Sequence, residues 1–191
     1  MGVGYPLDLV VCVALGVDMF DCVFPTRTAR FGVALVTTGS VRLKSKEHAE
    51  DLRPVDDQCH CTTCKNYTRA VLHVMFKENN ALAAQLLTKH NVSYMMRLMR
   101  TMRKAIMEGP AAHTEYVENF MRLQFPQGDV PIWAVEALAT ADIHISTTLS
   151  INPTTSSATA TTAAASSSTT TEEKQSGEDD TKVTKKAKLQ S

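Results

Sequence analysis

The chain of 191 residues is long enough for one folded domain with a tail, or for part of a larger protein. Its 20 basic and 20 acidic side chains balance, so net charge does not favour nucleic-acid binding. This balance does not exclude a local basic patch that binds RNA. Three of the five cysteines lie within six residues, which excludes the wide spacing of a secreted disulfide framework. No apolar run reaches the roughly 20 residues of a membrane span. We therefore expect a reducing, intracellular compartment and no membrane span.

The amino-terminal part of the sequence predicts alternating helix and strand. Residues 6–16 are apolar between a leading proline and a closing glycine, which predicts a helix. Residues 17–24 form a short apolar run before a proline and predict a strand buried on both faces, as in a parallel sheet. Residues 31–44 predict a hairpin, because two apolar segments flank a Thr-Thr-Gly-Ser turn.

The rest of the sequence predicts a polar loop, a helical region and a tail. After the loop at 46–57, apolar residues recur at a spacing near 3.6. This spacing predicts helices at about 67–77, 80–90, 92–107 and 114–124, then a helix and a tail strand within 133–145. The methionine-rich segment 94–102 is expected to pack in a core or an interface. Residues 147–191 are rich in Ser and Thr and are expected to be disordered, since they offer little apolar surface to bury.

A cluster of cysteines at CxCxxC spacing, Cys59, Cys61 and Cys64, lies in a predicted loop. Three thiolates and one imidazole satisfy the tetrahedral preference of zinc, and four protein ligands leave no position for a reactive water. We therefore predict one structural zinc ion that ties the loop to the helical region. His73 and His90 are both candidates for the fourth ligand.

Charged residues near the amino terminus are candidates for chemistry and RNA contacts. Asp21 lies in the apolar run 17–24, where a carboxylate needs a partner or a function. Carboxylates act as nucleophiles at anomeric carbons, and a capping or salt-bridged role is the alternative. Arg27 and Arg30 follow in a predicted loop. Arginines suit the phosphates and bases of RNA loops, but taken alone these two are more simply solvated charges.

Several segments together resemble the tRNA-guanine transglycosylase family, in order and at similar separations. They are Met1–Gly4, Val17–Gly32, Cys59–Cys64, Arg69–His73 and Thr88–Asn91. The resemblance covers residues 1 to about 123 and concerns the carboxy-terminal part of the family's enzymes. Residues 133–145 are more similar to the eukaryotic catalytic subunits than to the bacterial enzymes.

The resemblance implies an α/β fold, the carboxy-terminal part of a (β/α)8 barrel with a zinc-binding helical subdomain. Residues 1–45 would hold the last barrel strands and the hairpin, 46–146 the zinc-binding and helical region, and 147–191 the disordered tail. The implied reaction is base exchange in the anticodon loop of tRNA. Guanine at the wobble position is replaced by queuine in eukaryotes, or by a precursor base in bacteria, through a covalent aspartyl-ribosyl intermediate.

The resemblance also implies roles for single residues. Asp21 matches the nucleophile, and His90 matches the fourth zinc ligand. Arg27, Arg30 and Asp8 match residues at the nucleotide beside the exchanged base. Met1 matches a methionine that packs on the flat face of the bound base.

The implied partners are the tRNA anticodon loop, the queuine or guanine base, and a second subunit. That subunit is a noncatalytic paralogue in a heterodimer, with a homodimer as the alternative. The implied location is the cytoplasm, with peripheral association with organelle membranes as an option.

The family's amino-terminal barrel strands have no counterpart in this sequence. They carry the second aspartate, which is the general acid/base, and the residues that recognise the incoming base. We therefore expect an incomplete catalytic subunit. The alternative is a noncatalytic, zinc-stabilised module that binds RNA or another subunit.

Overall fold

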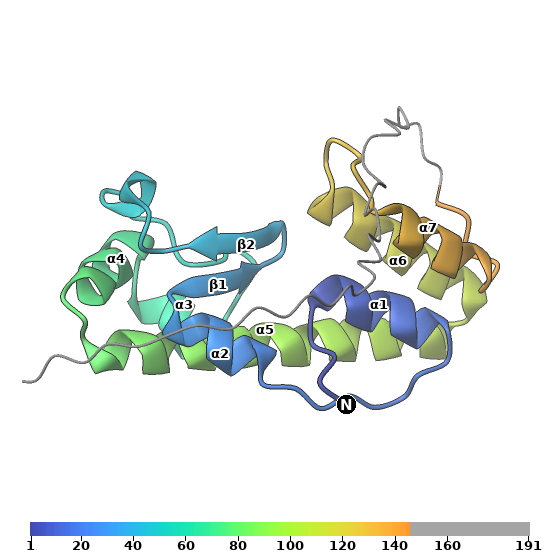
Figure 1. Ribbon diagram of the computed structural model, residues 1–191, viewed down its shortest axis with the longest axis horizontal. Coiled ribbons are helices and arrows are strands. Elements are labelled where there is room, and N and C mark those ends of the chain that lie inside the picture. Colours follow the sequence, from blue (N-terminus) through green and yellow to red (C-terminus); the bar gives the residue numbers. More distant parts are fainter. Residues whose placement is uncertain (146–191) are drawn as a thin grey trace, which may run out of the picture. The chain divides into compact units, whose positions relative to one another are not determined.

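The computed structural model describes residues 1–145, which form a mixed helical fold with one small sheet (Figure 1). In chain order the elements are α1 (Pro6–Ala14), α2 (Phe24–Arg30), β1 (Val33–Val36), β2 (Gly39–Arg42), the 3₁₀ turn η1 (Lys46–His48), α3 (Thr62–Asn66), α4 (Arg69–Lys77), α5 (Ala81–Glu108), α6 (Pro110–Gln124) and α7 (Ile132–Ala139). The prediction of disorder for residues 147–191 lies outside the described residues.

The first predicted helix and the hairpin are confirmed. α1 begins at a proline in its first turn and ends before Gly16, whose φ of 95° suits glycine. β1 and β2 pair antiparallel, with Val36 opposite Gly39. The turn therefore spans only Thr37 and Thr38, which makes it two residues shorter than predicted.

The predicted strand at residues 17–24 is wrong. Up to Phe24 the segment is neither strand nor helix, and two of its apolar side chains, Met19 (86%) and Val23 (61%), are largely exposed. A buried parallel strand needs a neighbour on each side. Within residues 1–145 the only strands are β1 and β2, which pair with each other. The local pattern therefore has no sheet to join here, and the described residues contain no barrel strands.

Two helices, α2 and α5, also differ from the prediction. The segment that carries Arg27 and Arg30 was predicted as a loop but forms the helix α2, which begins beside Pro25, a residue well suited to the first turn of a helix. The two helices predicted for 80–90 and 92–107 form the single helix α5, capped by Asn80 and stopped by Gly109 at a φ of 119°. No proline or glycine interrupts this stretch, so the helix continues. The helix predicted from Trp133 is confirmed as α7, whereas the tail strand after it does not form.

Two apolar clusters lie along α5 and hold the fold together. The first joins the carboxy-terminal half of α5 to α1, α6 and α7, and includes Val10, Met95, Leu98, Met102, Val117 and Leu138. The second joins the amino-terminal half of α5 to the hairpin and α4, and includes Leu43, Val55, Leu72, Phe76 and Leu87. Met95, Leu98 and Met102 of the methionine-rich segment thus pack in the core, as predicted, whereas Met96 is exposed. In the described part of the chain, no helix is both long and apolar enough to cross a membrane.

Candidate metal centre and RNA-contact residues

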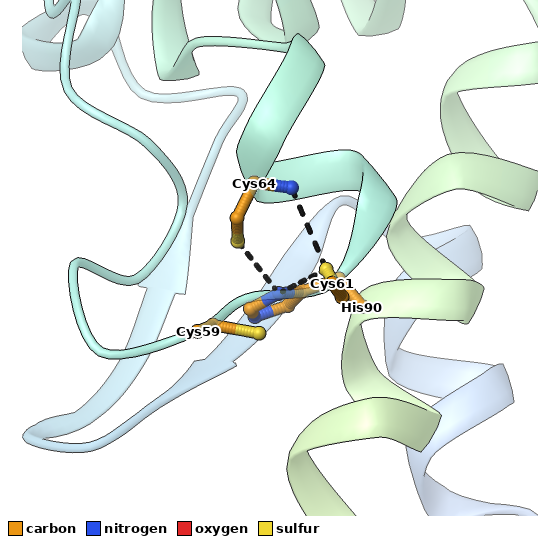
Figure 2. A group of neighbouring side chains, drawn as sticks. All are labelled: Cys59, Cys61, Cys64 and His90. Atoms are coloured by element: carbon orange, nitrogen blue, oxygen red, sulfur yellow. Dashed lines mark hydrogen bonds between the residues drawn. The ribbon is translucent and has the colours of Figure 1, made fainter.

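The four predicted metal ligands come together, as Figure 2 shows. The candidate ligand atoms of Cys59, Cys61, Cys64 and His90 all lie within 4.8 Å of one another. His90 Nδ1 is 3.2 Å from the Cys64 sulfur and 3.7 Å from the Cys61 sulfur. His73, the rival fourth ligand, instead places its Nδ1 2.8 Å from the Leu43 carbonyl oxygen. The choice of His90 is therefore confirmed.

Three separate segments supply the ligands. Cys59 lies in the loop before α3, whereas Cys61 caps the amino terminus of α3 and its sulfur accepts a bond of 3.4 Å from the Cys64 amide. Cys64 lies one turn further along, so of the three cysteines predicted in a loop, one lies in a short helix and one caps it. Thr63 donates to the Leu86 carbonyl over 2.8 Å and so fastens α3 against α5.

The imidazole of His90 is prepared to bind a metal through Nδ1. Its other nitrogen, Nε2, lies 2.8 Å from the Leu35 carbonyl oxygen, which can only accept, so Nε2 carries the proton. The lone pair on Nδ1 is then free and faces the sulfurs. The side chain is fully buried, and this burial lowers the pKa of His90, which favours the neutral form that metals bind.

The three thiols of the cluster favour the binding of a cation. Burial raises the pKa of both Cys59 and Cys64. Burial also acts to raise the pKa of Cys61, but hydrogen bonds from the Cys64 amide and the neighbouring thiols outweigh it, so the pKa of Cys61 is lowered. Three thiolates this close together need a cation, and a Cys₃His set suits tetrahedral zinc. The cluster fits a structural zinc site.

The predicted nucleophile lies beside the start of the chain. The Gly2 amide donates to the Asp21 carbonyl over 2.7 Å and contacts the Asp21 carboxylate over 3.3 Å. Asp21 and Met1 are both exposed. A Cβ on Gly4 would lie 2.5 Å from the Cys22 sulfur, so only glycine permits this close approach. The structure thus places Met1 and Asp21 on two adjacent segments.

The other predicted RNA contacts lie on α1 and α2. Arg27 and Arg30 are exposed on α2, and neither guanidinium group forms a hydrogen bond or an ion pair within residues 1–145. Asp8 is half-buried in α1, and this burial raises its pKa. In that same part of the chain no hydrogen bond or ion pair joins Asp8 to Asp21 or to the two arginines. The structure therefore does not bring these four residues into a single contact group.

One structural residue next to the metal ligand was not assigned a role from the sequence. Asn91 is fully buried, and its amide nitrogen lies within 3.3 Å of the Pro25 carbonyl, the Val33 carbonyl and the Thr28 hydroxyl. Its oxygen accepts from the Leu35 amide over 2.9 Å. Asn91 therefore connects α5 to both α2 and β1. Its sequence signals are a polar residue on an apolar helix face and its place in the segment Thr88–Asn91, and neither of them indicates these bonds.

Comparison with known proteins places the chain in a family. A family model described as queuine tRNA-ribosyltransferase matches residues 1–126. The queuine tRNA-ribosyltransferase catalytic subunit of Caenorhabditis briggsae is 49% identical over 123 residues, covering 64% of this chain and 29% of the relative. The queuine tRNA-ribosyltransferase of Thermus thermophilus is 45% identical over 139 residues, which cover 73% of this chain and 35% of the relative. The catalytic subunit of Schizosaccharomyces pombe is 42% identical over 155 residues, which cover 76% of this chain and 37% of the relative.

The chain spans about a third of the length of these curated relatives. The match nevertheless covers Asp21, the arginines of α2 and all four ligands of the zinc site. By this match, the chain belongs to the queuine tRNA-ribosyltransferase family.

Proposed function

We propose that the chain takes part in tRNA base exchange, in which queuine replaces guanine at the anticodon wobble position. Asp21 attacks the anomeric carbon of the ribose, guanine leaves, and the incoming base displaces the aspartate from the resulting ester. The observation that carries this proposal is the exposed carboxylate of Asp21 beside Met1, within the segment that matches the family.

The exposed arginines of α2 support an RNA role in the same region. Arg27 and Arg30 lie three residues apart and are therefore neighbours on one helix face. Without partners in the described residues, both guanidinium groups are free to bind phosphate oxygens or base edges of an RNA loop. We assign the flat face of the base to Met1, and a contact to the neighbouring nucleotide to Asp8.

The proposal includes a wider assembly. The relatives match this chain over 29% to 37% of their length, which supports the idea that it acts together with further parts of the family's fold. We propose that those parts complete a (β/α)8 barrel and supply the general acid/base, and that the chain is an incomplete catalytic subunit. The division at residues 45 and 146, the cytoplasmic location and a noncatalytic second subunit belong to the same proposal. The relatives named as catalytic subunits favour a heterodimer.

The covalent intermediate gives the test of the proposal. The chain is co-expressed with the part of the C. briggsae catalytic subunit that precedes the matched region, and incubated with an anticodon stem-loop RNA. We expect a ribosyl ester that survives denaturation and shifts the protein on a gel. Asp21→Asn keeps the size of the side chain but removes the nucleophile, so the adduct should vanish while RNA binding persists. Asp18→Asn, an exposed aspartate three residues earlier, serves as the matched control.

An adduct that persists in Asp21→Asn would rule out the assignment of the nucleophile. The second candidate function is a noncatalytic, zinc-stabilised module that binds RNA or another subunit. It is favoured by one observation: within residues 1–145 the Asp21 carboxylate bonds only to the Gly2 amide, so no acid/base side chain is hydrogen-bonded to it. RNA binding without any adduct, with the co-expressed partner present, would support this module and contradict base exchange.

A further inference from the structure

Three of the four zinc ligands are held in place by helices. α3 and its N-cap hold Cys61 and Cys64, and α5 holds His90, whose ring is fixed by the Leu35 carbonyl. Cys59 differs because it lies in the loop before the N-cap of α3, outside any helix or cap, as Figure 2 shows. Its position therefore depends on what fixes the loop that precedes it.

That loop is fixed by a buried carboxylate. The side chain of Asp56 is only 6% exposed. Its oxygens lie 2.6 Å from Arg97 Nη2, 3.2 Å from the Thr37 hydroxyl and 3.1 Å from the Gln58 amide. The Asp56 carbonyl accepts from the Cys59 amide over 3.0 Å. Asp56 thus bonds to both the residue before Cys59 and Cys59 itself.

Arg97 completes the clamp from α5. Besides the ion pair with Asp56, its Nη1 donates to the Gln58 carbonyl over 2.6 Å. Both peptide groups of Gln58 are therefore held, the amide by Asp56 and the carbonyl by Arg97. Arg97 follows His90 by seven residues, which is about two helical turns and the same face of α5. One helix face therefore supplies a ligand and also fixes the loop that supplies another.

We propose that Asp56 and Arg97 are positioning residues that hold Cys59 in the zinc site. Removing the cation that pairs with a buried carboxylate is strongly destabilising, because the negative charge is left uncompensated. When Arg97 is removed, Asp56 turns toward water and takes the loop 56–59 with it, so Cys59 leaves the metal while the other ligands stay. The effect is selective because α3 and α5 hold those ligands independently.

The test uses the zinc-loaded full chain and the variants Arg97→Met and Asp56→Asn. Cysteines are alkylated with N-ethylmaleimide, and each modified peptide is quantified by mass spectrometry over time. We expect alkylation of Cys59 to become about 10-fold faster, while Cys61 and Cys64 stay protected. Zinc affinity, measured by competition with a chelator, should fall about 10- to 100-fold, as for other residues that support metal ligands. Cys12 and Cys22, outside the cluster, provide internal reference rates.

Two further variants separate positioning from general stability. Arg97→Lys keeps the charge but not the two-pronged geometry, so it should restore part of the protection of Cys59. Arg100→Gln, an exposed arginine on the same helix, should change neither rate nor affinity. Equal acceleration at Cys59, Cys61 and Cys64 in Arg97→Met, together with loss of helical circular dichroism, would contradict the proposal. Unchanged alkylation of Cys59 with zinc affinity within about twofold of wild type would contradict it as well.

Discussion

Replacing the buried Asn91 with alanine is expected to destabilise the zinc-loaded protein more than replacing an exposed asparagine does. The substitution removes the acceptor of the Leu35 amide and the donor to the carbonyls of Pro25 and Val33. Asn91 is fully buried, so water reaches these three backbone groups poorly. An unsatisfied buried polar group costs about 1–3 kcal/mol. The Pro25 carbonyl still accepts from the Thr28 hydroxyl over 3.2 Å, so two groups are left unsatisfied. Because some water can enter the vacated space, we take the low end for each of the two and expect a loss of about 2 kcal/mol.

The measurement is urea unfolding of the zinc-loaded chain, followed by far-ultraviolet circular dichroism. Asn66→Ala is the matched control, because Asn66 is exposed and makes a single bond of 2.9 Å to the Thr62 carbonyl. Its free energy of unfolding should change by less than about 0.5 kcal/mol. If Asn91→Ala lost less than about 1 kcal/mol, the reasoning would be refuted, since Asn91 would then not be the tie between α5, α2 and β1.

Two further predictions concern the metal and the ion pairs of Asp51 with Arg53 and Arg69. Metal analysis should find less than one zinc per chain in His90→Ala. It should still find one zinc per chain in His73→Ala, because His73 bonds to the Leu43 carbonyl and not to the metal site. The reverse result would overturn the ligand assignment. A hydrogen bond from Arg53, with the charge of Arg69, holds the pKa of Asp51 well below its usual range, so Asp51 stabilises the fold above about pH 4 and loses this effect at lower pH. Near pH 7 the free energy of unfolding of the wild type should therefore exceed that of Asp51→Asn, and this difference should shrink below pH 4. A difference that does not depend on pH would exclude this role of Asp51.

The parts of the structure that could be predicted from sequence depend on local information. The cysteine spacing of the zinc site indicates metal binding by itself, because few other sites place three thiols within six residues. The start of α1 and the end of α5 are marked by proline and glycine, whose backbone preferences act at one position. The hairpin likewise follows from two short apolar segments on either side of a turn.

The parts that could not be predicted depend on distant residues. The apolar run at 17–24 has the pattern of a strand, but a strand exists only where another one pairs with it, and no local pattern reports that. The ion pair between Asp56 and Arg97 joins residues 41 positions apart, and each of them alone resembles an ordinary surface charge. Asn91 is similar, since its four partners become neighbours only after α2, β1 and α5 have packed.

The metal site and the proposed RNA-contact helix are joined through His90 and Asn91, two consecutive residues of α5 that also hold β1. β1 pairs with a strand on one side only, and a two-stranded hairpin is marginal by itself. Leu35 in β1 is held instead by α5, its carbonyl by His90 and its amide by Asn91. Asn91 also holds the first turn of α2, which carries Arg27 and Arg30. A zinc ion bound by His90 would fix the turn of α5 from which Asn91 extends, and would thereby stabilise the first turn of α2 through Asn91.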